Sequence, residues 1–151
     1  GIILYGLYPS HDFTLPFTPK PVMTLKTKIV QLRRIHKGET VGYGRTFTAI
    51  KPTLVAAIPV GYADGFRRQP HNWNHVLVRG QYAPLIGRVS MDQSSIDVTR
   101  IKGVTVSDEV VLIGQQGAKE ITVDDVAKTL GTINYEVTSA LAARVSRVYL
   151  R

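Results

Sequence analysis

The sequence of 151 residues contains no cysteine, which excludes disulfides and cysteine-ligated zinc or iron–sulfur sites. It also lacks an apolar run of the roughly 20 residues that a membrane-spanning helix needs, and its first residues lack the basic start of a signal peptide. These absences predict a cytoplasmic protein. An initiator methionine is missing as well, since the chain opens on Gly1-Ile2-Ile3-Leu4, and we expect it to be a piece of a longer protein.

Acidic residues are scarce. Eleven Asp and Glu stand against 19 Lys and Arg, which gives a formal net charge of +8. A basic domain can bind nucleic acid, and a small basic β-barrel of that kind is one alternative. The basic residues are spread along the chain, however, and are adjacent only at Arg33-Arg34 and Arg67-Arg68. This distribution favours contact with an acidic partner or with anionic small molecules.

Short segments in which apolar and polar residues alternate, separated by glycines, dominate the chain from residue 22 to residue 113. They cover residues 22–35, 41–47, 54–60, 75–78, 82–86, 94–98 and 109–113. Short strands at this spacing predict a mainly β protein, an antiparallel sheet closed into a barrel. The four prolines at positions 9, 16, 19 and 21 disfavour regular structure before it. We therefore expect residues 1–20 to be a boundary arm and residues 21–151 to be the β-rich domain.

The pattern becomes helical near the C-terminus. Thr122 and Asp125 have the spacing of a capping box, and apolar residues follow at helical intervals up to Gly131. This predicts one short helix there. Residues 134–144 can form a second helix, and residues 145–150 return to the pattern of a strand.

Read one at a time, the chemical signals are weak. His71 and His75 lie four apart, but in a Pro/Asn/Trp segment that does not predict a helix, so no metal site is expected. Asp64-Gly65 is typical of a hairpin turn. Tyr43 lies between Gly42 and Gly44, which indicates either a bulge or a place where the backbone approaches a ligand.

Five motifs in a fixed order are more informative than any one of them, and they extend over essentially the whole chain. They are Gly1-Ile2-Ile3-Leu4-Tyr5-Gly6, Val41-Gly42-Tyr43-Gly44-Arg45-Thr46-Phe47, Ile58-Pro59-Val60-Gly61-Tyr62-Ala63-Asp64-Gly65, Gly87-Arg88-Val89-Ser90-Met91-Asp92-Gln93 and Thr132-Ile133-Asn134-Tyr135-Glu136-Val137. Together they strongly resemble the C-terminal half of bacterial alanine racemase. The resemblance implies a pyridoxal 5′-phosphate enzyme that interconverts L- and D-alanine for peptidoglycan. It also implies an N-terminal (β/α)₈ barrel, a mainly β C-terminal domain and a head-to-tail homodimer with shared active sites.

The resemblance assigns roles by position. Tyr43 matches the catalytic tyrosine, which reaches into the partner's barrel and removes the α-proton of L-alanine. Met91 matches the residue whose backbone N–H holds the substrate carboxylate, with Asp92 beside it. A tyrosine ordinarily has a pKa of about 10, so a tyrosine that acts as a base near neutral pH needs positive charge close to its hydroxyl.

The remaining matches concern the cofactor and the way into the site. Tyr135 matches a tyrosine that contacts the cofactor phosphate, and the backbone amides of Gly1 and Ile2 match others that bind it. The residues that match the lining of the substrate access passage are Tyr62, Arg68 and Arg88.

Two of the family's groups have no counterpart in this chain: the lysine that binds the cofactor covalently and acts as the second base, and the arginine that faces the pyridine nitrogen. We therefore expect the chain to be half of an active site and inactive alone. A domain that only dimerises and has lost catalysis is the other alternative, although such a domain would not need Tyr43, Met91 and Tyr135 together.

Overall fold

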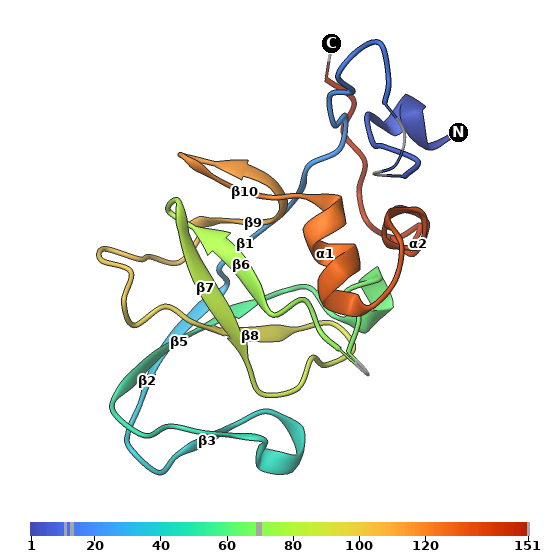
Figure 1. Ribbon diagram of the computed structural model, residues 1–151. Helices are drawn as coiled ribbons and strands as arrows, with labels where there is room; N and C mark the ends of the chain where they lie inside the picture. Colours follow the sequence, from blue (N-terminus) through green and yellow to red (C-terminus); the bar gives the residue numbers. More distant parts are fainter. Residues whose placement is uncertain (11, 13, 69–70, 151) are drawn as a thin grey trace.

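The computed structural model describes residues 1–10, 12, 14–68 and 71–150, so residues 11, 13, 69–70 and 151 of the two expected domains lie outside it. One antiparallel sheet of eight strands dominates the described residues (Figure 1). Its strands are β1 (Leu25–Lys28), β2 (Gln31–Ile35), β5 (Thr53–Ile58), β6 (His75–Val78), β7 (Gln81–Ile86), β8 (Ser94–Asp97), β9 (Glu109–Gln116) and β10 (Lys119–Ile121). The order in the sheet is β1-β9-β6-β7-β8-β5-β2, and β10 pairs with the far half of β9.

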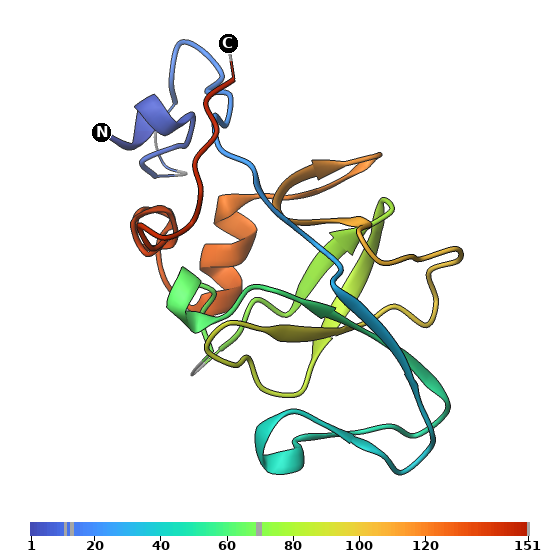
Figure 2. The same ribbon diagram turned by 180° about the vertical axis from the view of Figure 1, so that it is seen from behind.

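The two edges of this sheet are consecutive in the chain, which passes from β1 to β2 through Ile29 and Val30 (Figure 2). The N–H of Ile29 donates to Asp108 O beside β9 at 2.9 Å, and the N–H of Val30 donates to Ala57 O on β5 at 2.9 Å. A single bent segment thus joins the edges, while β1 and β2 are not paired with each other. The mainly β antiparallel prediction is confirmed, but the fold is barrel-like only in this loose sense. The single strand expected over residues 22–35 was wrong, because the chain changes partner strands at the bend.

The core fills the inside of the bent sheet and the space beneath α1 (Val123–Leu130). The largest fully buried side chains include Phe66, Ile29, Ile58, Leu77, Ile96 and Leu112. Trp73 stacks on Phe66 with 4.7 Å between the ring centroids, and its Nε1–H donates to Leu112 O at 3.1 Å. The chain segment on either side of residues 69–70 is therefore fixed to β9.

The first predicted helix is confirmed with its boundaries. Thr122 Oγ1 accepts from Asp125 N–H at 3.0 Å, and the Asp125 carboxylate accepts from Thr122 N–H at 2.9 Å, which is a complete capping box. α1 ends at Gly131, whose φ is 67°. The second helix, α2 (Asn134–Ser139), is shorter than expected. The strand predicted over residues 145–150 is absent from the described structure: Val148, Tyr149 and Leu150 are 80–90% exposed, and alternation alone cannot form a strand without a partner edge.

The segment around Tyr43 also differs from the prediction of one strand over residues 41–47. A small hairpin replaces it, with β3 (Thr40–Val41), the 3₁₀ turn η2 (Tyr43–Arg45) and β4 (Phe47–Thr48). Gly42 and Gly44 have φ of 76° and 72°, in the left-handed region that breaks a strand. Two further 3₁₀ turns are η1 (Ile2–Tyr5) and η3 (Tyr62–Asp64), and Asp64-Gly65 ends η3 and does not join two strands.

None of the helices in the described ranges has the length and apolar character needed to cross a membrane.

Candidate functional site

The segment of residues 87–92, which follows β7 on the way to β8, contains three of the candidate site residues and is contacted by two others, Tyr62 and Arg68. We call it the 87–92 segment; it contains Arg88, Met91 and Asp92. Ser90 N–H donates to Gln93 O at 2.9 Å, which closes the end of the segment into a tight turn. Three other parts of the chain pack against it: the Tyr43 hairpin, η3 and the stretch after α2.

The Tyr43 hairpin packs against the start of the 87–92 segment through glycines. A Cβ atom placed on Gly87 would lie 2.7 Å from Val41 O, and one on Gly42 would lie 3.0 Å from Arg88 N. A Cβ on Gly44 would overlap the guanidinium of Arg88. The tip of the hairpin is therefore held close to Arg88, while the side chain of Tyr43 itself is 68% exposed. The tyrosine is presented to the surroundings and is not packed in the core.

η3 lies along the other side of the same segment. Tyr62 N–H donates to Ser90 O and Ala63 N–H donates to Met91 O, each at 3.0 Å. Just beyond η3, Arg68 Nη1 donates to Val89 O at 3.3 Å. Tyr62 and Arg68, predicted to line the access passage, are thus positioned by backbone carbonyls of this segment.

These contacts leave the N–H groups of Met91 and Asp92 available among the described residues. The carbonyls of Ser90 and Met91 are engaged by η3, but no described residue accepts a hydrogen bond from Met91 N–H or from Asp92 N–H. Met91 is 53% exposed. Adjacent unpaired N–H groups at an exposed turn are suited to an anion such as a carboxylate.

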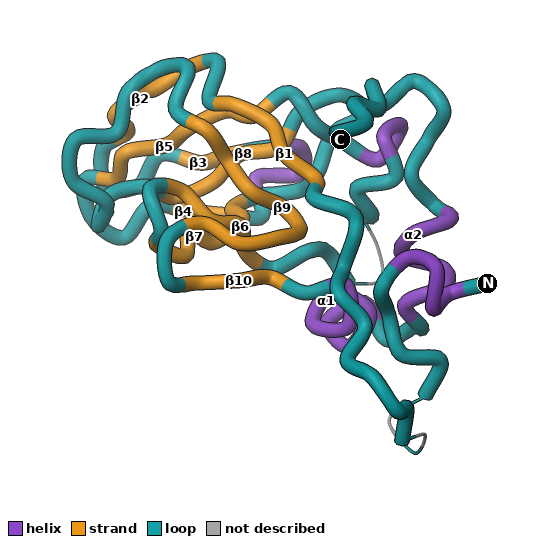
Figure 3. The backbone as a smooth tube through the Cα atoms, turned by 90° about the horizontal axis from the view of Figure 1, so that it is seen from above, coloured by secondary structure: helices purple, strands orange, loops and turns teal. Residues whose placement is uncertain are grey.

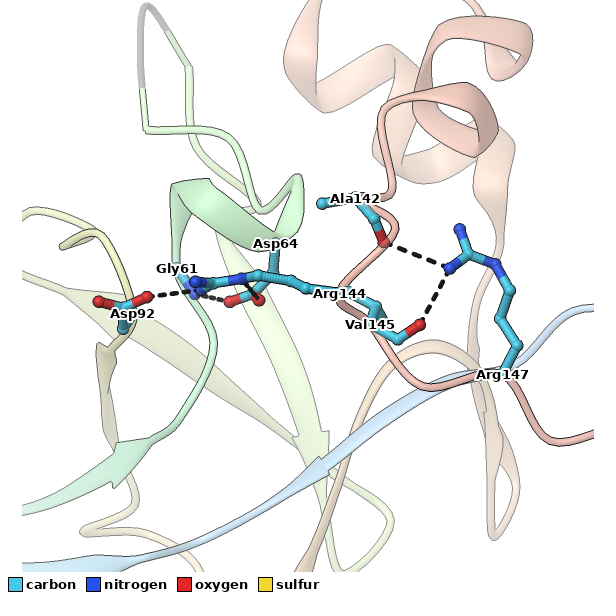
Figure 4. Close-up of polar contacts among 7 residues, drawn as sticks. All are labelled: Gly61, Asp64, Asp92, Ala142, Arg144, Val145 and Arg147. Atoms are coloured by element: carbon cyan, nitrogen blue, oxygen red, sulfur yellow. Dashed lines mark hydrogen bonds and ion pairs between the residues drawn. The ribbon is translucent and has the colours of Figure 1, made fainter.

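Arg144, after α2, joins two carboxylates of the site (Figure 4). Its Nε donates to Asp64 Oδ1 at 2.7 Å, and its Nη2 donates to Asp92 Oδ1 at 2.6 Å. Partial burial raises the pKa of Asp64, but the hydrogen bonds from Arg144 and from Gly61 N–H outweigh this and hold that pKa below its ordinary value. The two carboxylates in turn raise the pKa of Arg144. Sequence reasoning missed Arg144, since its partners are 80 and 52 residues away and no local pattern indicates them.

A second group of candidate residues lies around α2. Tyr135, in its first turn, is 42% exposed. Its neighbour Asn134 is buried and donates from Nδ2 to Tyr8 O at 2.9 Å and to Asp124 Oδ1 at 3.0 Å. The bond to Tyr8 O fixes the N-terminal segment beside α2 (Figures 1 and 3), and the bond to Asp124 joins α2 to α1. In that segment Gly1 is exposed and Ile2 is buried. The sequence analysis also missed that Asn134 attaches the N-terminal segment to α2. Its position next to Tyr135 in the motif was the available signal.

The Tyr43 hairpin and the group around α2 are at separate places on the molecule. The hairpin of β3 and β4 lies at the end opposite to the N-terminus and α2 in all three whole-molecule views (Figures 1, 2 and 3). Between η3 and α2 there is a cavity of about 490 Å³, whose lining includes Tyr62, Arg68, Trp73 and Glu136. Tyr62 and Arg68 thus line a cavity between the groups. Among the described residues, no three His, Asp or Glu side chains are grouped to hold a metal ion.

The described residues form an antiparallel β domain with two short helices, and the candidate residues Tyr43, Met91 and Tyr135 are exposed. The sequence profile of the family "Alanine racemase, C-terminal domain" matches residues 22–149. The chain therefore belongs to the alanine racemase C-terminal domain family, as the resemblance of its motifs indicated.

Known proteins agree in sequence and in fold. Alanine racemase 2 of Caldanaerobacter subterraneus subsp. tengcongensis is 49% identical over 150 residues, which are 99% of this chain and 39% of that protein. Alanine racemase 1 of Clostridium acetobutylicum is 47% identical, with 100% of this chain and 39% of that protein covered. The crystal structure of alanine racemase from Bacillus anthracis with bound L-Ala-P has a TM-score of 0.94 and 37% identity, again over 100% and 39% of the two chains. The chain thus spans about two fifths of the length of these relatives.

The same fold occurs in a racemase of another amino acid. Histidine racemase from Leuconostoc mesenteroides subsp. sake has a TM-score of 0.89 and 33% identity, over 100% of this chain and 40% of that protein. The fold alone therefore does not define the amino acid.

Proposed function

We propose that this chain is the C-terminal domain of an alanine racemase, which interconverts L- and D-alanine in the cytoplasm for cell-wall synthesis and works with an N-terminal (β/α)₈ barrel. The observation that carries the proposal is the Tyr43 hairpin, which glycine contacts hold against the 87–92 segment, where Met91 N–H has no acceptor among the described residues. These contacts support roles for Tyr43 as a proton acceptor and for Met91 N–H as a donor to a carboxylate. Eight of the curated relatives, all at least 40% identical, carry the name alanine racemase.

Within this proposal, Tyr43 removes the α-proton of L-alanine while Met91 N–H donates to the substrate carboxylate. Racemisation needs proton-transfer groups on both faces of the α-carbon, and the barrel's lysine is the second group. Arg88, which lies against Gly44, brings positive charge to the tip of the hairpin.

The residues around α2 fit a phosphate group. The phenol hydroxyl of Tyr135 and the backbone N–H groups of Gly1 and Ile2 are hydrogen-bond donors, and the Asn134 bond to Tyr8 O brings their two segments together. Such donors suit the phosphate of pyridoxal 5′-phosphate. When bound, this cofactor supplies the electron sink that stabilises negative charge on the α-carbon after proton loss.

The separation of the two groups supports a homodimer with shared sites. The Tyr43 hairpin and the Tyr135 region lie at different ends of the domain, so one bound amino acid could not easily contact both in one copy (Figures 1 and 3). In a head-to-tail dimer, Tyr43 and Met91 serve the partner's barrel, while Tyr135, Gly1 and Ile2 serve the site of their own subunit.

The test is a chimera that joins this chain to the N-terminal part of the Clostridium acetobutylicum relative. We expect the purified dimer, with cofactor, to convert L-alanine to D-alanine, and the 151-residue chain alone to show no conversion. A chimera that dimerises and binds the cofactor but does not racemise alanine would favour the non-catalytic dimerisation alternative. Activity on histidine with none on alanine would instead move the proposal to the substrate of the Leuconostoc relative.

A further inference from the structure

We infer that Arg144 is a positioning residue for the substrate carboxylate: it holds Asp92, and through Asp92 the peptide N–H of Met91, in the direction that carboxylate binding requires. This inference rests on the proposed function, because it assumes that Met91 N–H is the donor to the carboxylate. It adds to that function a residue far from the carboxylate site in sequence, on the stretch after α2.

The guanidinium of Arg144 connects the carboxylates of Asp64 and Asp92. Nε and Nη2 belong to one rigid plane, and they donate to Asp64 Oδ1 at 2.7 Å and to Asp92 Oδ1 at 2.6 Å (Figure 4). Two carboxylates from distant parts of the chain are therefore held at a fixed separation. The backbone near Arg144 is itself attached to η3, since Ala142 N–H donates to Asp64 O at 3.2 Å.

Asp64 connects this arginine to the backbone of the 87–92 segment. Its second oxygen accepts from Gly61 N–H at 2.8 Å, which fixes the start of η3. η3 in turn donates to the carbonyls of Ser90 and Met91. Met91 N–H belongs to the peptide plane between Ser90 and Met91, which is held at Ser90 O by Tyr62 N–H. The next plane, between Met91 and Asp92, is held at Met91 O by Ala63 N–H and through the Asp92 side chain by Arg144. These restraints limit the rotation of the turn that carries Met91 N–H.

The exposure of the Arg144–Asp92 pair argues against a role in stability alone. The side chains of Arg144 and Asp92 are 47% and 57% exposed, and pairs this open to solvent contribute little to folding. Asp92 also has a charge that repels a carboxylate bound nearby, and Arg144 offsets this charge. Positioning and charge compensation make different predictions for Asp92→Asn, so they can be separated.

The experiment uses the chimeric racemase with Arg144→Gln, Arg144→Lys and Asp92→Asn, and measures kcat and KM for L-alanine. The probe of the carboxylate site is propionate, which shares the methyl and carboxylate groups of alanine but lacks its amine. We expect KM and the inhibition constant of propionate to rise together by roughly tenfold in Arg144→Gln, as for a weakened hydrogen bond to a charged group, with kcat within about threefold. Arg144→Lys keeps the charge but loses the planar pair of N–H donors that reaches both carboxylates. We therefore expect it to behave like Arg144→Gln.

Asp92→Asn tests the same restraint if Arg144→Gln does not fold, because it leaves the Arg144–Asp64 pair intact. We expect it to raise both constants by a similar factor, and the double variant Asp92→Asn/Arg144→Gln to be no worse than either single one. Arg147→Gln is the matched control. Arg147 donates to the carbonyls of Val145 and Ala142 (Figure 4) and to that of Leu141. Its loss therefore removes the same charge without removing a bond to Asp92.

Three results would overturn the inference. KM and the propionate constant could stay unchanged in Arg144→Gln, or rise equally in Arg147→Gln. Alternatively, Asp92→Asn could restore wild-type constants to Arg144→Gln, which would show that Arg144 only compensates charge. An unmodified chimera that does not racemise alanine is a different failure: it removes the proposed function first and this inference with it.

Discussion

The guanidinium of Arg88 lies so close to Gly44 that a side-chain carbon at position 44 would overlap it. Gly44 also has a φ of 72°, which residues with a Cβ rarely adopt. Both restrictions apply next to Tyr43, so the glycine following the tyrosine is required by the fold of the hairpin tip. The arginine predicted from the resemblance to line the access passage thereby also packs against the glycine that follows the catalytic candidate.

Gly44→Ala is expected to lower both stability and activity. Left-handed backbone costs about 1–2 kcal/mol for a residue with a Cβ, and the new methyl displaces the Arg88 guanidinium from the hairpin tip. Gly38→Ala is the matched control, because Gly38 has a φ of 91° but open space around it. Chemical denaturation should show a loss in both variants, whereas racemisation by the chimera should fall only in Gly44→Ala. Full activity of Gly44→Ala would contradict the role given to this contact.

Tyr43→Phe in the chimera removes the hydroxyl and keeps the ring. Exchange of the α-proton of L-alanine with solvent should fall by roughly a hundredfold or more, the usual size of a general-base contribution. Exchange from D-alanine begins with the lysine on the other face and should suffer less. Proton exchange followed by nuclear magnetic resonance measures both. An equal loss from the two isomers would mean that Tyr43 positions the substrate and does not accept its proton.

The Asp64 carboxylate gives a pH dependence of stability. Its pKa in the folded chain is below the ordinary 3.8, so the ionised form is favoured by folding. Its contribution is therefore present above about pH 4 and is lost as the pH falls through the folded-state pKa. Asp64→Asn should lower the free energy of unfolding by about 1–3 kcal/mol at pH 7, and the difference from wild type should shrink below pH 4. A difference that is constant from pH 7 to pH 3 would show that the charge of Asp64 is not involved.

Asn134→Ala tests the connection between α2 and the N-terminal segment. The buried amide bonds both Tyr8 O and Asp124 Oδ1, and its loss should destabilise the chain by about 1–3 kcal/mol. Limited proteolysis should then cleave within residues 1–10 faster than in wild type. Thr138→Ala is a control on the same helix, since Thr138 Oγ1 bonds only carbonyls of α2 among the described residues. Equal cleavage rates in Asn134→Ala and wild type would contradict the proposed attachment.

The parts of the fold that were predicted correctly depend on local signals. The capping box of Thr122 and Asp125 and the final Gly131 determine the limits of α1, and the apolar run of residues 75–78 coincides with β6. The prediction of a strand over residues 145–150 was wrong because a strand needs a partner edge, which residue patterns do not reveal. The prediction of one strand over residues 22–35 missed the bend at Ile29 for a similar reason, since the bend depends on pairing with both β9 and β5.

In the candidate site, too, local motifs were predicted correctly and long-range contacts were not. The motifs selected Tyr43, Met91 and Arg88, and the structure brings the Tyr43 hairpin and Met91 to one segment. The shape of the hairpin was missed, because the φ angles of Gly42 and Gly44 are set by packing on the 87–92 segment. Arg144 was missed because an ion pair across 52 residues has no local pattern. The role assigned to each of these residues in catalysis stays a prediction.

The central claim is that this domain supplies Tyr43 to the active site of a partner subunit, and a mixed dimer tests it most directly. One chimera carries Tyr43→Phe, and the other carries an alanine in place of the barrel's cofactor-binding lysine. Each homodimer should be nearly inactive. If the sites are shared, a mixed dimer has one site with the lysine of one subunit and Tyr43 of the other, so a random mixture should recover about a quarter of wild-type racemisation. If Tyr43 acted within its own subunit, no mixed dimer would contain an intact site, and absence of any recovery would contradict the account.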